Sequence, residues 1–209
     1  MHFAHIFDLV GGRRLPEEDD GPAHRYRLMI GGVVAATACA AIYGAAAGTA
    51  WIAHSDTPWM GLLDVLKLPM VLVLSGLAAV PASLLAWKLF DARHECTDLL
   101  MGLVTANLTA AAVLAVSAPI VALYYLTTDF LGGTLAIAVA CGAVCIGVLS
   151  GMRSIAWRIP ADVNVLRLAP VIAVMTGVQL LALVQLVALA SPILPEMTVF
   201  DGGMDAILE

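Results

Sequence analysis

The chain has 209 residues, of which 61% are hydrophobic and 12% are charged, and its formal net charge is −6. A soluble domain carries about 25% charged residues, so this composition, with a mean hydropathy of +0.95, excludes an ordinary soluble globule. The few Lys and Arg residues are scattered, which excludes a basic patch for nucleic acid. We therefore expect an integral membrane protein whose partner is the lipid bilayer, with no nucleic-acid partner.

Residues 1–27 form a mixed, charged N-terminal segment ahead of the first long apolar run. The segment lacks the apolar stretch and cleavage site of a secretory signal peptide. We therefore expect the first apolar run to remain in the protein as a membrane anchor.

Five apolar runs follow, and each is long enough to cross a bilayer core of about 30 Å, which takes about 20 helical residues. We predict an all-α integral membrane protein whose residues 28–194 form one domain of five transmembrane helices. None of the five runs has an acid or a base in its middle, where such groups would mark an ion or proton pathway. The predicted spans cover residues 28–53, 68–90, 99–126, 130–152 and 166–190.

Between the first two runs lies HSDTPWMGLLDVLKLP, residues 54–69. Its large apolar residues recur at i, i+3, i+4 and i+7, the spacing of one helix face: Trp59, Leu62, Leu63 and Leu66. We predict a short amphipathic helix over residues 57–66 that lies in the membrane interface, with Asp64 and Lys67 on its polar side. The apolar face could instead dock another subunit, and the sequence leaves both interpretations open.

The distribution of basic residues predicts the orientation in the membrane. With five spans, four Lys or Arg residues in the N-terminal segment, two after the second span and three after the fourth span share one side; Lys67 alone lies opposite. We predict a multi-pass protein of the bacterial inner membrane with a cytoplasmic N-terminus. Residues 195–209 then form an acidic tail outside the cytoplasm.

Prolines and glycines inside the runs bear on helix packing. Pro81 and Pro119 each remove a backbone hydrogen bond and can kink a helix. Glycines four residues apart allow two helices to approach closely, and two such pairs occur: Gly44 with Gly48, and Gly147 with Gly151.

Three amides lie inside the predicted spans, namely Asn107, Gln179 and Gln185. A buried amide needs hydrogen-bond partners, so all three are candidates for polar contacts between helices, including one between Asn107 and Gln179.

The sequence contains few residues that indicate catalysis or the binding of a metal or cofactor. The four cysteines lack zinc-site spacing, and no nucleophile-elbow or phosphate-loop motif occurs. His54, at the end of the first run, could ligate a chlorophyll-type magnesium, although an interfacial histidine close to Trp51 is the favoured interpretation. We expect no enzymatic activity, no metal and no cofactor.

Three short motifs occur in order along the chain: Lys67-Leu68-Pro69 entering the second span, Ala118-Pro119-Ile120 with Tyr124 or Tyr125 ending the third, and Gln179 and Gln185 followed by Ser191-Pro192. In these motifs the chain resembles a poorly characterised group of bacterial inner-membrane proteins that is loosely similar to the five-span Yip family. The resemblance covers about residues 43–200 and implies architecture without an activity.

These features favour a non-catalytic subunit or scaffold of a larger membrane assembly, with other membrane subunits or further copies of the chain as partners. The first alternative is a transporter or channel for a neutral or lipid-like solute, using the two prolines as kinks. A weaker alternative is a pigment- or cofactor-binding subunit that uses His54.

Overall fold

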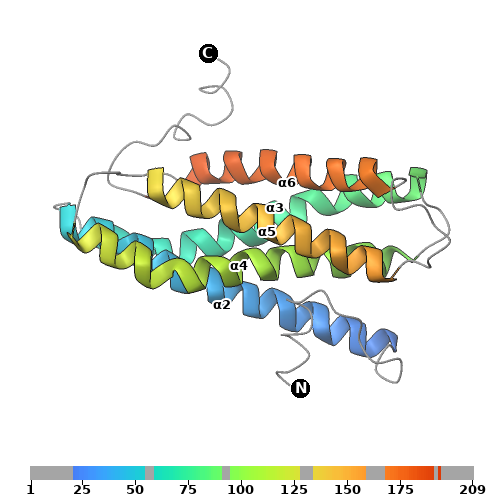
Figure 1. The fold of residues 1–209 in the computed structure, drawn as a ribbon, viewed down its shortest axis with the longest axis horizontal. Helices are drawn as coiled ribbons and strands as arrows, with labels where there is room; N and C mark the ends of the chain where they lie inside the picture. Colours follow the sequence, from blue (N-terminus) through green and yellow to red (C-terminus); the bar gives the residue numbers. More distant parts are fainter. Residues whose placement is uncertain are drawn as a thin grey trace, which may run out of the picture.

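The computed structural model describes residues 21–54, 59–90, 95–127, 134–158, 168–190 and 193. The predicted acidic tail and residues 1–20 of the N-terminal segment lie outside these ranges. The described elements are helices that run side by side along one axis (Figure 1): α2 (Pro22–His54), α3 (Trp59–Phe90), α4 (Cys96–Thr127), α5 (Thr134–Arg158) and α6 (Ala169–Ala190).

All five helices are long and apolar enough to cross a membrane, which confirms the multi-pass, all-helical prediction within the described residues. The shortest, α6, has 22 residues, and α2 has 33. At about 1.5 Å per residue, even α6 spans the hydrocarbon core of a bilayer.

The first turns of α3 differ from the prediction. Instead of a separate short helix before the second span, α3 continues without a break from Trp59 through Pro69 to Phe90. Pro69, at the start of the predicted second span, lies inside this helix. A proline inside a membrane helix is tolerated when neighbouring groups satisfy the freed carbonyl. Pro81 and Pro119 likewise lie inside α3 and α4, which continue past them.

Helix α4 is the centre of the bundle. In its most apolar stretch 56% of residues are buried, compared with 17% in α6. Helix α4 packs against α2 and α5, while α2 also packs against α3, and α6 lies along α3. Helix α6 is therefore an outer helix that leaves most of its surface to lipid or to another protein.

Large side chains close the bundle at one end, where α3 and α5 finish and α4 and α6 begin. Trp87, Leu99, Ile155, Leu168 and Met175 share one buried cluster there. Toward the other end, α2 and α4 pack through a second cluster that contains Tyr43, Val121 and Tyr125.

Glycines set how closely the helices approach. A Cβ atom on Gly48 would overlap the carbonyl oxygen of Gly61, and one on Gly44 would overlap the carbonyl oxygen of Asp64. Helices α2 and α3 therefore touch backbone to backbone. The second predicted pair lies at the α4–α5 contact, where Gly151 faces Gly102 and Gly147 faces Ala106.

Candidate functional site

An amide pair links the outer helix to the central one. The structure brings together two of the three predicted amides: the Nε2 of Gln179 on α6 donates a hydrogen bond to the Oδ1 of Asn107 on α4, 2.6 Å away. On α3, Gly76 leaves room for this pair, since a Cβ there would lie 2.8 Å from the Asn107 Nδ2. Gly76 has no glycine partner at four-residue spacing, so the sequence carries no signal that marks it as a packing position.

A small cavity of about 20 Å³ adjoins the amide pair, between α3, α4, α5 and α6. Its polar lining consists of Asn107, Thr176 and Gln179, and its other walls are apolar. The buried hydroxyl of Thr176 has no hydrogen-bond partner among the described residues. A cavity of this size and polarity holds about one water molecule.

Two hydroxyl contacts join α4 to α5 close to this region. The Thr109 Oγ1 donates to the Ser150 Oγ at 3.1 Å, and Thr105 and Ser154 lie 3.5 Å apart through their hydroxyl oxygens. These polar groups satisfy one another, so they act as contacts between helices.

The third predicted amide, Gln185, lies apart from the other two. Its side chain is exposed on α6 and makes no hydrogen bond to the described residues. Leu181 and Leu189, one helical turn to either side, are also exposed, Leu189 to 81%. Gln185 thus places an amide in an outward-facing apolar surface.

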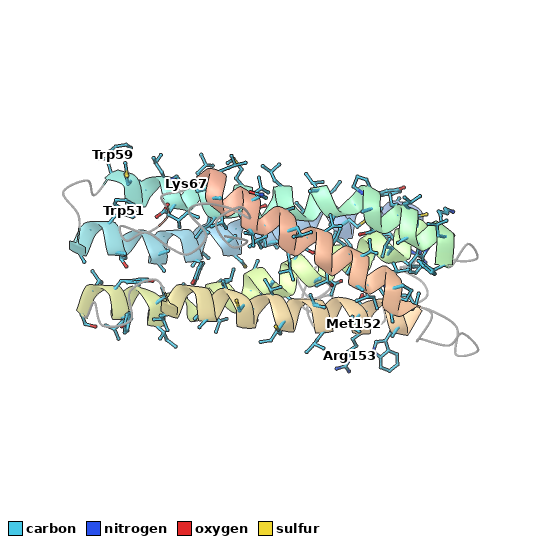
Figure 2. All side chains as sticks on the ribbon, turned by 90° about the horizontal axis from the view of Figure 1, so that it is seen from above. Trp51, Trp59, Lys67, Met152 and Arg153 are labelled. Atoms are coloured by element: carbon cyan, nitrogen blue, oxygen red, sulfur yellow. The ribbon has the colours of Figure 1, made fainter. Side chains whose placement is uncertain are left out.

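The predicted apolar face at the start of α3 points outward. Trp59, Leu62, Leu63 and Leu66 are all exposed in the isolated chain. Figure 2 shows Trp59 near one end of the bundle, the same end as Trp51 and Lys67, while Met152 and Arg153 lie toward the other end.

The opposite face of these turns is buried, which differs from the prediction. Asp64 was expected on the polar side of a surface helix, but its exposed fraction is 0%. The close approach of α2 at Gly44 and Gly48 is the cause, because it covers the turn that carries Asp64. Helix α3 therefore contains a buried acid, although no predicted span had an acid in its middle.

A charged cluster joins the first turns of α2 and α4. The Nη1 of Arg25 lies 3.1 Å from a carboxylate oxygen of Glu95 and 3.5 Å from one of Asp98. The side chains of Arg25 and Asp98 are only 18% and 12% exposed. Arg25 is on α2, Glu95 directly precedes α4 and Asp98 is in its first turn, so the cluster holds these two helix ends together.

The remaining candidates form no metal or cofactor site within the described residues. No group of three His, Cys, Asp or Glu side chains there could hold a metal ion. All four cysteines are free, and Cys141 and Cys145 are exposed on α5. The side chain of His54, the candidate pigment ligand, lies outside the described part of the structure.

Comparison of the chain with protein-family models, with curated proteins and with solved structures finds no match.

Proposed function

We propose that the chain is a non-catalytic subunit or scaffold of a larger membrane protein assembly. The observation that supports this proposal is the exposed amide of Gln185 on α6, the outermost helix. A polar group that faces hydrocarbon without a partner costs several kcal/mol. A partner helix that offers a hydrogen bond to Gln185 would remove that cost.

The surface around Gln185 suits a helix partner. Leu181 and Leu189 extend the same face of α6 by one turn in each direction. Amides in membrane helices contribute specificity by pairing across a contact that leucines fill. The exposed face of Trp59, Leu62 and Leu66 on α3 offers a second apolar surface for lipid or for a subunit.

The same proposal includes a location in the bacterial inner membrane, with the N-terminus in the cytoplasm and the C-terminus outside. The support is the position of the basic residues. All described Lys and Arg residues other than Lys67 lie at the end of the bundle where α2 and α4 begin and α3 and α5 end: Arg25, Arg27, Lys88, Arg153 and Arg158. Basic residues favour the cytoplasmic side of a membrane. Trp51, Trp59 and the first turns of α3 would then lie at the outer interface.

A second candidate function is a transporter or channel for a neutral solute. The cavity lined by Asn107, Thr176 and Gln179 favours it, because these groups can donate and accept hydrogen bonds without carrying charge. At about 20 Å³ the cavity admits one water molecule, so a larger solute requires the helices to move. Solute flux into liposomes that is lost on Asn107→Leu would support this function.

Purification of the full chain from native membranes in a mild detergent tests the subunit proposal. We expect a particle whose mass exceeds that of the chain with its detergent and that contains a second chain, or a further copy of this one, in fixed stoichiometry. A monodisperse single chain across several mild detergents would contradict the proposal.

A further inference from the structure

Asp64 is an ionisable residue that has no part in the proposed subunit role. It lies five residues into α3, about 7.5 Å along the helix axis from Trp59. Its side chain is completely buried, and neither carboxyl oxygen has a hydrogen-bond partner within the described part of the chain. Such a group is rare in a membrane bundle and marks a functional position by default.

Two described groups near Asp64 could stabilise a negative charge, and neither is hydrogen-bonded to it. The nearest cation is Lys67 on the same helix, whose Nζ lies 4.0 Å from the Asp64 Oδ1, too far for a hydrogen bond. The neighbouring donor on α2 is the indole N–H of Trp51. That N–H is donated to the backbone carbonyl oxygen of Ile193, 2.8 Å away.

Among the side chains that the structure describes, the helices that pack on this part of α3 bring no further charge. Helix α2 contributes the buried phenol of Tyr43 and α4 that of Tyr125, in a cluster packed against Leu68, one turn along α3 from Asp64. Helix α6 carries no titratable residue at all. The backbone of α2 at Gly44 covers the turn of Asp64 and keeps water from it.

A carboxylate in such a place would have to be compensated by good hydrogen bonds and a close cation, and otherwise the group takes up a proton. We propose that Asp64 is a proton-binding site at the crossing of α2 and α3, where it holds its proton while the two helices are packed. The ligand is the proton itself, and the site is independent of Gln185 and of the amide pair.

Infrared spectroscopy of the full chain in lipid vesicles tests this proposal, because it detects a protonated carboxyl without a reagent that must reach it. The spectrum of the Asp64→Asn variant is subtracted from that of the unchanged chain. We expect the difference to contain the carbonyl band of a protonated acid at mildly acidic and neutral pH. A difference that contains only carboxylate bands at mildly acidic pH would overturn the proposal.

Two further variants make the result specific. Subtracting the spectrum of Asp98→Asn should give only carboxylate bands at neutral pH, because Arg25 pairs with Asp98. In Lys67→Met the Asp64 band should persist, whereas its appearance only in that variant would mean that the lysine holds Asp64 ionised. If Asp64→Asn fails to fold, Asp64→Leu replaces it as the reference, because it removes the carboxyl without leaving a polar group at the buried position. The same bands then decide: a protonated-acid carbonyl band in the difference supports the proposal, and carboxylate bands alone at mildly acidic pH overturn it.

Discussion

Gln179 and Asn107 form a hydrogen bond of 2.6 Å that joins α6 to α4, although 72 residues separate them in the sequence. Helix α6 otherwise packs along α3 and is the least buried of the five. The bond therefore fixes the rotation of an outer helix against the central one. It also fixes which α6 residues face inward and leaves Gln185 facing outward.

The first prediction concerns this bond. Asn107→Leu and Gln179→Leu should each destabilise the bundle, and their effects should not add, with a coupling energy of about 0.6 kcal/mol. A double-mutant cycle measured by reversible unfolding in mixed detergent checks it. Strictly additive effects would contradict a direct bond.

The second prediction concerns the crossing of α2 and α3. Gly48→Ala should destabilise the protein by about 1–3 kcal/mol, because the new methyl group would overlap the carbonyl oxygen of Gly61. Gly142→Ala is the matched control, since a Cβ there meets nothing within 4 Å. Thermal unfolding in detergent should separate the two variants; equal midpoints would show that the crossing is not tightly packed.

The sequence was sufficient to predict the spans, because each apolar run meets the length that a bilayer demands. It was not sufficient for the start of α3, where the predicted interfacial helix and the predicted second span are parts of one helix that continues through Pro69. Asp64 could not be placed either. Its burial depends on Gly44 and Gly48 of another helix, and the register between two helices is not visible in one sequence.

The candidate polar contacts show the same limit. Amide positions within the spans indicate which side chains need partners, and Asn107 with Gln179 was one of the pairs they allowed. Only the packing shows that Gln185 faces outward and that Gly76 leaves room for the bonded pair. The helical spacing of Trp59, Leu62 and Leu66 predicted that they lie on one face of a helix, and in the structure that face is exposed.

The third prediction concerns the charged cluster at the start of α2. Arg25→Ala should cost about 2 kcal/mol, between the effect of an exposed ion pair and that of a buried one, because Asp98 would lose its cation while remaining largely buried. Arg27→Ala is the control, since Arg27 is exposed. Equal stability of the two variants in reversible unfolding would show that the cluster contributes nothing.

The fourth prediction concerns orientation and uses the two ends of α3. In a background whose four cysteines are replaced by alanine, Trp59→Cys should react with a membrane-impermeant maleimide added to intact cells stripped of their outer membrane. Phe90→Cys should react only after the inner membrane is permeabilised. Both side chains are exposed in the isolated chain, so they differ in location rather than burial. The reverse pattern would invert the proposed topology.

The most direct test of the subunit proposal compares two glutamines of α6 in particles purified from native membranes. Gln185→Leu should lose the partner chain at least several-fold while the stability of the chain itself is unchanged, because the amide faces outward. Gln179→Leu should weaken the bundle yet keep the partner, because its amide is bonded to Asn107. If Gln185→Leu leaves the particle mass and the partner stoichiometry unchanged, α6 is not the docking surface and the account is contradicted.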